Sequence, residues 1–196
     1  MGFAILFATT YDDDYGISIM SGFGKITILD PKQSPIFENN MYYDNELSFQ
    51  LSKPNDDWNI RVASESFRSE ELAYLESKGY LDGIYVEKEL DKRFLVSVFN
   101  VQSENFQLND YISKQITMMN SQNNIKVPIK QISQSNDWAL FSFDKETNDK
   151  DSYAEQLLFL KNNKLYVLQY VGKSPENLTP FEKSDFNSIF NSFEVF

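Results

Sequence analysis

The chain has 196 residues, of which 41% are hydrophobic and 15% are aromatic. This apolar content suffices for one folded domain with a core, and the 17 Phe and 11 Tyr residues argue against a disordered chain. The 29 acidic residues outnumber the 18 basic ones, which gives a formal net charge of -11. Such a charge repels nucleic-acid phosphates and anionic lipid headgroups, so nucleic acid is excluded as an expected partner.

The sequence contains neither cysteine nor histidine. Disulfides, thiolate nucleophiles and zinc–thiolate sites are therefore excluded, and so are Ser-His-Asp, Cys-His and His-based zinc chemistry. Chemistry based on carboxylates, Lys or Tyr stays open. We assign no catalytic, cofactor-binding or metal-ligating residue, and we expect a non-enzymatic binding or accessory protein that works without a cofactor.

Residues 1–40 are predicted to form an apolar segment followed by a linker or a loose hairpin around residues 22–24. The apolar run at residues 2–8 is too short to span a bilayer, which needs roughly 20 residues. It also lacks the basic flank of a signal peptide. Two interpretations stay open: a first β-strand, or the last part of a signal peptide or membrane anchor whose upstream portion is missing. In the second case the acidic residues 12–14 would lie in a linker beyond the membrane.

A compact domain is predicted over residues 41–196, from alternating apolar residues, β-branched runs and helical spacing. In chain order the expected elements are strands at 47–51 and 58–62, a helix at 70–78 stopped by Gly79, strands at 84–86 and 94–101, a helix at 108–119, and strands at 127–132, 138–143, 153–160 and 164–171. The strand at 94–101 is expected to be central. The last four strands suit an antiparallel meander, with Asn162 and Asn163 in its final turn.

Two helices carry apolar stripes that should pack on the sheet. In the helix at 108–119, Asn109 or Asp110 lies near the start, and its two methionines are interpreted as core filling. The closing helix has the clearest signature, because Thr179, Pro180 and Glu182 fit the N-cap, the first helical position and the capping box. Its predicted buried stripe consists of Phe186, Ile189, Phe190 and Phe193.

The order of these elements resembles the PsbP-like family, whose α/β/α sandwich is shared with the Ran-binding Mog proteins. Four core-packing patterns carry the resemblance: the strand 47–51 leading through Pro54 to Trp58, the strand 94–101 before the helix 108–119, the paired strands 153–160 and 164–171, and the terminal residues 189–193. The resemblance implies an α+β fold in which a central, mostly antiparallel sheet is flanked by helices.

Proteins resembling PsbP are commonly exported and dock beside membrane complexes, whereas the Mog proteins act on a small GTPase in the nucleus. The apolar run at residues 2–8 fits the first picture better. No photosystem II metal or docking residue is carried over, because the histidines relevant to such sites have no counterpart in this chain.

Several polar groups are candidate sites, and for each we favour a plainer structural interpretation. Tyr42, Tyr43, Asp44, Asn45 and Glu46 are able to hold a cation or a basic partner, but the pattern is more typical of a strand entry with a solvated face. The two triplets Asp56-Asp57-Trp58 and Asn136-Asp137-Trp138 are interpreted as polar turns that lead into a strand whose Trp packs inward.

The segment between residues 144 and 151 contains four acidic residues whose oxygens can converge on Ca²⁺, namely Asp144, Glu146, Asp149 and Asp151. Lys145 and Lys150 dilute this charge, so a solvated loop is favoured over a calcium site. Asn177, Leu178 and Thr179 form a glycosylation sequon, which is usable if the protein is exported.

The leading hypothesis is an exported, membrane-tethered domain that binds a protein partner or a membrane complex. The alternative is a small-molecule or lipid-binding module whose apolar pocket lies between the sheet and a covering helix. A cytosolic enzyme that uses carboxylates or Lys is the third and weakest hypothesis.

Overall fold

The computed structural model describes residues 36–38, 40–88, 92–101, 106–121, 130–134, 137–147 and 150–196. The predictions for the apolar run at residues 2–8, for the acidic residues 12–14 and for the hairpin around residues 22–24 lie outside these ranges. The division of the chain at residue 40 therefore stays a prediction. One short strand, β1 (Ile36–Glu38), precedes that point and pairs with the next strand along the chain.

The centre of the fold is a seven-stranded sheet, called the large sheet, in which every neighbouring pair is antiparallel. Its order is β4 (Asn59–Val62), β5 (Tyr80–Lys88), β6 (Lys92–Asn100), β10 (Lys164–Gly172), β9 (Lys150–Lys161), β8 (Trp138–Thr147) and β7 (Lys130–Gln134). Strands β7 to β10 are consecutive neighbours, so the predicted meander is confirmed. The strand predicted to be central, β6, has neighbours on both sides.

A second, four-stranded sheet, called the small sheet, joins residues from the two ends of the described chain. It contains β1, β2 (Met41–Asp44), β3 (Phe49–Ser52) and β11 (Glu194–Val195), in that order. Two side chains of β10 attach it to the large sheet. Tyr166 Oη donates to the Leu47 carbonyl at 2.9 Å, and Lys164 Nζ donates to the Glu46 carbonyl at 2.7 Å.

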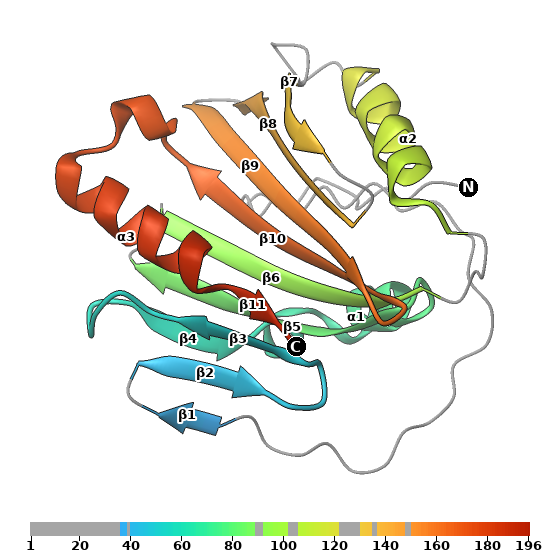
Figure 1. Ribbon diagram of the computed structural model, residues 1–196, viewed down its shortest axis with the longest axis horizontal. Helices are drawn as coiled ribbons and strands as arrows, with labels where there is room; N and C mark the ends of the chain where they lie inside the picture. Colours follow the sequence, from blue (N-terminus) through green and yellow to red (C-terminus); the bar gives the residue numbers. More distant parts are fainter. Residues whose placement is uncertain are drawn as a thin grey trace.

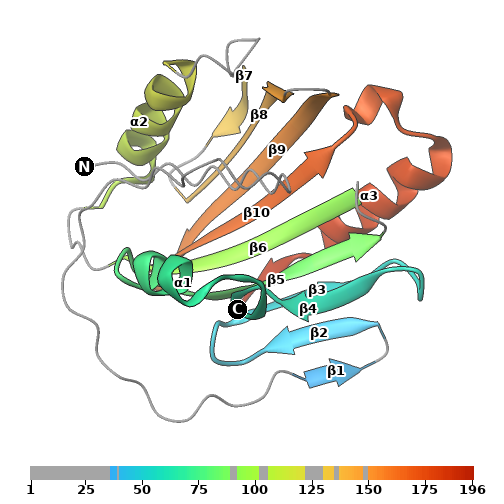
Figure 2. The same cartoon turned by 180° about the vertical axis from the view of Figure 1, so that it is seen from behind.

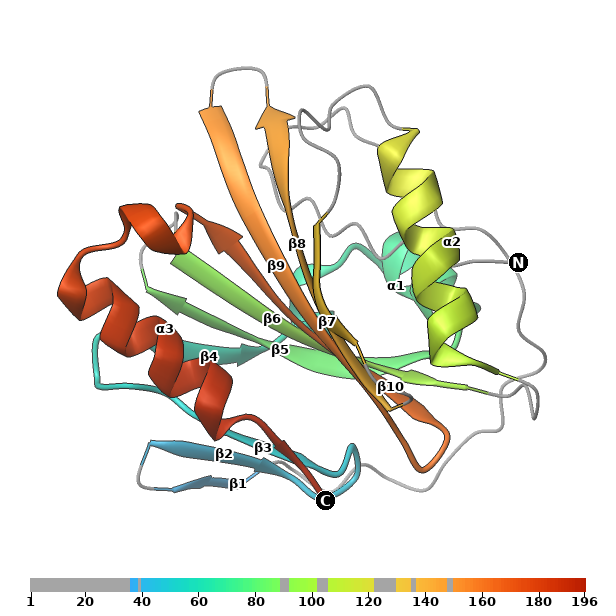
Figure 3. The ribbon, with the colours of Figure 1, turned by 45° about the horizontal axis from the view of Figure 1, so that its top comes forward.

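Three helices cover the large sheet: α1 (Ser69–Glu76), α2 (Leu108–Asn120) and α3 (Pro180–Ser192). In Figure 1, α3 and the small sheet lie in front of the large sheet, and Figure 2 shows α1 and α2 from behind. Figure 3 shows α3 and α2 on opposite sides of the sheet. The predicted α+β sandwich, with a central antiparallel sheet flanked by helices, is therefore confirmed.

Each face of the large sheet has its own hydrophobic core. The core under α1 and α2 is built around Leu95, Leu158 and Val167. The core under α3 and the small sheet is built around Phe94, Val96 and Leu168. Because side chains alternate along a strand, β6 and β10 supply both cores, which explains their near-continuous apolar sequence.

Local sequence signals place the helix ends as expected. Thr179 caps α3, with its Oγ1 accepting from the Glu182 amide at 3.3 Å while the Glu182 carboxylate accepts from the Thr179 amide at 2.7 Å. Gly79 follows α1 with a φ of 90°, a conformation that favours glycine. The start of α2 also agrees with the expectation, since the helix begins at Leu108 with Asn109 and Asp110 in its first turn, although the N-cap Gln107 makes no side-chain capping bond.

Asn162 and Asn163 both have positive φ, 51° and 60°, and form the tight turn between β9 and β10. The strands predicted at 47–51 and 58–62 lie in different sheets, as β3 and β4. The acidic segment after Asp144 is not an open loop, because β8 and β9 pair through it with Glu146 opposite Asp151 and Thr147 opposite Lys150. Asp149 lies outside the described residues.

Candidate functional site

A pocket of about 250 Å³ lies where α3 meets the large sheet, and we call it the α3 pocket. Strands β5, β6 and β10, the approach to β4 and the first two turns of α3 supply its walls. Its lining residues are Trp58, Lys88, Phe94, Tyr170, Leu178, Thr179, Phe181, Glu182, Asp185 and Phe186.

The floor of the α3 pocket is a set of packed aromatic rings. Phe94 has no exposed surface, and its ring centroid lies 5.0 Å from that of Tyr170, 5.7 Å from that of Phe186 and 5.9 Å from that of Trp58. The rings of Tyr170 and Phe186 meet edge to face at 4.9 Å. Such packed rings hold one another in place, so the floor is preformed.

Charged side chains surround this floor. Trp58 Nε1 donates to Asp185 Oδ2 at 2.9 Å, which ties α3 to the start of β4 and fixes the Asp185 carboxylate at the pocket wall. Lys88 Nζ lies 2.8 Å from Asp57 Oδ2. Glu182, besides capping α3, lies 3.6 Å from Lys173 Nζ through its Oε1 atom.

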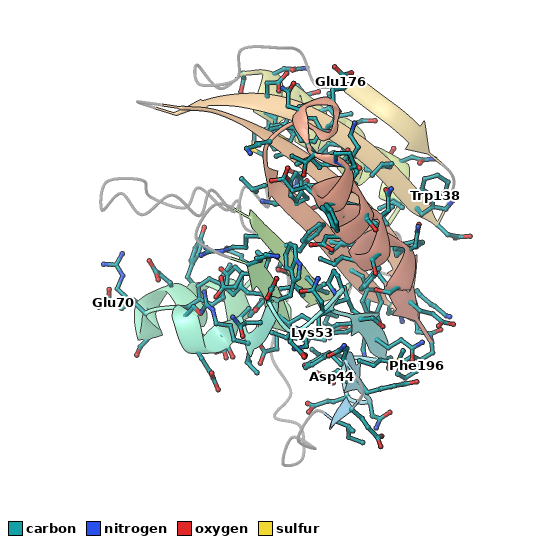
Figure 4. The ribbon with its side chains drawn as sticks, turned by 90° about the vertical axis from the view of Figure 1, so that its left-hand side faces the viewer. Asp44, Lys53, Glu70, Trp138, Glu176 and Phe196 are labelled. Carbon is teal, nitrogen blue, oxygen red and sulfur yellow. The ribbon has the colours of Figure 1, made fainter. Side chains whose placement is uncertain are left out.

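Phe181 stands at the mouth of the pocket with 86% of its surface exposed. The two other large apolar side chains exposed among the described residues, Ile36 and Phe196, belong to the small sheet region instead. Figure 4 shows Phe196 beside the small sheet, near the labelled Asp44. Aromatic side chains are enriched at protein–protein interfaces, so this exposed ring beside a pocket is a candidate contact residue.

The opposite face of the large sheet carries an arginine cluster, defined as Arg61, Tyr85, Glu87 and Arg93. The two guanidinium groups lie over the Tyr85 ring, at 4.5 Å for Arg61 and 5.1 Å for Arg93. Glu87 bridges them, with 2.7 Å to Arg61 Nε and 3.1 Å to Arg93 Nε. Burial alone would raise the pKa of the Glu87 carboxyl, but the two arginines outweigh it and hold this pKa below its usual value.

The third arginine of the chain, Arg68, pairs with Glu71 at 2.9 Å at the start of α1. The Arg68 side chain donates to the Glu71 carboxylate, and this hydrogen bond lowers the pKa of Glu71. Since each of the three arginines has a carboxylate partner within the sheet or helix that carries it, we interpret them as structural ion pairs that brace β4, β5, β6 and α1.

Tyrosine–carboxylate pairs two residues apart recur on three strands, where both side chains point to one face. The Tyr42 hydroxyl donates to Asp44 at 2.9 Å, Tyr80 approaches Asp82 at 3.4 Å, and Tyr153 donates to Glu155. Burial raises the pKa of each tyrosine, and the neighbouring carboxylate adds to the rise. These tyrosines therefore stay protonated and serve the fold as hydrogen-bond donors.

Burial also raises the pKa of the Glu155 carboxyl, against the opposing effect of the Tyr153 hydrogen bond. The folded protein thus favours protonated Glu155, and this contribution to stability is lost as the pH rises through the folded pKa. Glu155→Gln should stabilise the protein at pH 7, on the order of 1 kcal/mol, because it removes a buried charge and keeps an acceptor for Tyr153. Urea denaturation between pH 4 and pH 8 measures this.

The gain from Glu155→Gln should shrink toward zero near pH 4, where the carboxyl is protonated in both states. Glu176→Gln, an exposed substitution of the same kind, provides the control and should show no such trend. A loss of stability for Glu155→Gln at pH 7 would contradict the prediction.

The aromatic–acidic group at residues 42–46 is not a solvated strand entry, which corrects that interpretation. Met41–Asp44 is the strand β2, and Tyr42 and Asp44 are buried. Asp44 uses its Oδ1 atom to accept the Leu47 amide at 2.8 Å, so it closes the turn into β3. The group therefore shapes the small sheet and leaves few oxygens for a cation.

The remaining candidates from the sequence are spread over the fold. Trp58 packs inward as predicted, whereas Trp138 at the start of β8 is only partly buried. Asn177 of the sequon is exposed at the end of a short 3₁₀ turn, Pro175–Asn177, close to the pocket residue Leu178. Among the residues that the structure describes, no three acidic side chains gather as a metal site.

The pocket-forming role of Asp185, Phe181 and Lys88 is not predicted by the sequence analysis. Local signals do single out other lining residues, namely Phe186 in the α3 stripe, Thr179 and Glu182 in the capping box, and Trp58 as an inward-packing Trp, but they do not show that these residues meet in one site. The contact between Trp58 and Asp185 joins residues 127 positions apart, which no local pattern reveals.

A scan against models of known protein families finds no match for this chain. A search of curated protein sequences finds no match either. A search of solved structures finds similarity to the solution structure of cyanobacterial PsbP (CyanoP) from Synechocystis sp. PCC 6803. The two share 13% sequence identity with a TM-score of 0.47, over 90% of this chain and 99% of that protein.

One of the two interpretations of the apolar run at residues 2–8 is the end of a signal peptide or membrane anchor. Within the described ranges, no helix combines the length and the apolar character that crossing a bilayer requires. The apolar run at residues 2–8 lies outside those ranges.

Proposed function

We propose that this protein is a non-enzymatic accessory domain that docks a protein partner at the α3 pocket. The observation that carries the proposal is the combination of a preformed aromatic floor with Phe181 at its mouth, 86% exposed. A ring in that position loses little conformational freedom on binding and offers a large apolar contact, which is how aromatic anchors act at interfaces.

The size of the pocket favours a partner's side chain over a free ligand. Pockets that enclose drug-sized ligands usually have about 300–1,000 Å³. The α3 pocket, with about 250 Å³, falls below this range, and a large share of its lining is already packed in the core. The small-molecule or lipid-binding alternative is therefore the weaker candidate.

Two features support a role without catalysis. The chain has no histidine or cysteine, the two side chains most used as general base and nucleophile near neutral pH. The buried tyrosines and the carboxylates beside them already bond to one another along their own strands.

Export and membrane tethering are also part of the proposal, and the apolar run at residues 2–8 supports them. A tethered domain would present the α3 pocket to a membrane complex from the side on which it is anchored. Fractionation of native cells into membrane and soluble parts tests the tether separately, and recovery of the chain only in the soluble part would contradict it.

Site-specific photo-cross-linking tests the docking role. A photoreactive phenylalanine analogue, p-benzoylphenylalanine, replaces Phe181 in the full chain, and native cells are irradiated before mass spectrometry. We expect one predominant protein adduct at this position. The same analogue at Ser113, which is exposed on α2 across the sheet, is the matched control and should not yield that adduct.

Binding to the purified adduct partner then provides the quantitative readout. Phe181→Ala should weaken this binding by roughly tenfold to a hundredfold, the usual loss for an aromatic anchor. The same adduct from both positions, or unchanged affinity of Phe181→Ala, would rule out the α3 pocket as the docking site.

A further inference from the structure

We infer that the anchor received by the α3 pocket is a cationic side chain, Arg or Lys, from a basic segment of the partner. This inference rests on the proposed docking role of the pocket and adds the chemistry of its occupant. It follows from the charges at the rim, from the aromatic rings of the floor and from the cost of the alternative occupants.

At the rim of the pocket, Lys88 and Glu182 each have an oppositely charged partner, whereas the Asp185 carboxylate has none in the part of the chain that the structure describes. Lys88 is paired with Asp57 at 2.8 Å, and Lys173 lies 3.6 Å from Glu182. Asp185 has no cationic partner among the described residues, and only its Oδ2 atom is used, by the Trp58 indole. The Oδ1 atom of a carboxylate that lines the pocket is therefore left as an acceptor.

The floor beside Asp185 consists of the π systems of Trp58, Phe186 and their neighbours. A cation near an aromatic face is attracted by the quadrupole of the ring, most strongly for Trp. A guanidinium or ammonium group entering the pocket thus meets a carboxylate oxygen and aromatic rings together, the two groups that stabilise a positive charge when water is displaced.

An apolar or an anionic anchor would fit this pocket worse. An aliphatic side chain would cover the Asp185 carboxylate without giving it a hydrogen bond, which leaves a charge desolvated and unpaired. An anionic group would meet the same carboxylate at close range in a chain of net charge -11. The net charge instead steers basic partners toward the surface.

NMR titration of the full-length protein tests the inference with two probes that differ only in charge. N-acetyl-argininamide carries the guanidinium, and N-acetyl-citrullinamide replaces it with a neutral urea group of the same shape. The reporter is the Trp58 indole N–H signal, which the hydrogen bond to Asp185 makes sensitive to the pocket. Trp138→Phe leaves Trp58 as the sole Trp and assigns the signal.

We expect the arginine probe to shift the Trp58 indole signal with roughly tenfold higher affinity than the citrulline probe. Asp185→Asn should clearly reduce this preference, since an amide oxygen still accepts the indole hydrogen bond but carries no charge, while the aromatic rings still attract the cation. Asp110→Asn, the same change at an exposed position on α2, should leave the tenfold preference intact.

Equal affinities in the unaltered protein, or a preference that is just as large in Asp185→Asn, would overturn the inference. So would the absence of a Trp58 shift with either probe. None of these outcomes decides the proposed docking role, which the cross-link at position 181 tests on its own. A position-181 adduct together with equal probe affinities means that the pocket docks a partner through an uncharged anchor.

Discussion

Phe94→Ala should lower the free energy of unfolding by about 3–5 kcal/mol, the usual cost of removing a buried ring. Phe94 has no exposed surface, and its ring lies within 6 Å of four other aromatic rings, the nearest being Tyr170 at 5.0 Å. These neighbours come from β10, from α3 and from the approach to β4, so they cannot all move into the space left by the ring. Urea denaturation at equilibrium measures the loss.

Phe181→Ala is the matched control for Phe94→Ala. It removes the same ring from a position that is 86% exposed, and it should change the free energy of unfolding by no more than about 0.5 kcal/mol. Together the two variants separate the structural part of the α3 pocket from its exposed mouth. Similar losses for both variants would mean that the core and the mouth of the pocket are not as distinct as the structure shows.

Gly83→Ala should destabilise the protein by at least about 3 kcal/mol, because the added methyl group meets backbone and not a movable side chain. A Cβ atom at Gly83 would lie 1.9 Å from the carbonyl oxygen of Val96 on the neighbouring strand β6. The β5–β6 pair already shifts register between Tyr80 and Asp82, and the Asp82 carboxylate accepts the Gly83 amide at 2.8 Å. The methyl group would force these two paired strands apart.

Gly172→Ala offers a comparison at the end of β10. There the added Cβ would lie closest to the hydroxyl of Tyr170, at 2.4 Å, and at the last residue of the strand a local backbone shift relieves this contact with less loss of pairing than at Gly83. Its loss of stability, measured by urea denaturation, should be clearly smaller than that of Gly83→Ala. A Gly83→Ala protein as stable as the unaltered one would show that β5 and β6 do not approach each other this closely.

The sequence predicts those parts of the fold whose cause is local. The capping box of α3 needs only Thr179 and Glu182, three residues apart. The final turn needs only two asparagines with positive φ. The meander follows from strands separated by short turns, and these elements are in place as expected.

The sequence predicts less well where the cause lies in distant parts of the chain. Alternation of apolar residues is equally visible in β3 and β4, but it does not say that one pairs with β11 and the other with β5. The α3 pocket is a similar case. Nothing in the sequence links Trp58 to Asp185, and only the fold brings Trp58 Nε1 within 2.9 Å of Asp185 Oδ2.

The sequence analysis also misjudges the aromatic–acidic group at residues 42–46. This group has the side chains of a cation site, yet the Asp44 carboxylate accepts hydrogen bonds from the Tyr42 hydroxyl and the Leu47 amide. Composition alone does not distinguish a carboxylate that shapes a turn from one that awaits a ligand. The distinction is made by the neighbouring donors, which only the folded chain supplies.

The pairing of β11 with β3 sets the order in which the molecule can be completed during synthesis. Glu194 lies opposite Gln50, so this edge of the small sheet must wait until nearly the whole described chain has left the ribosome. The large sheet and its α1–α2 face depend on no residue beyond Gly172. We therefore expect a nascent chain that buries one face early and keeps Phe49 and Phe94 accessible to chaperones until Ile189 and Phe193 arrive.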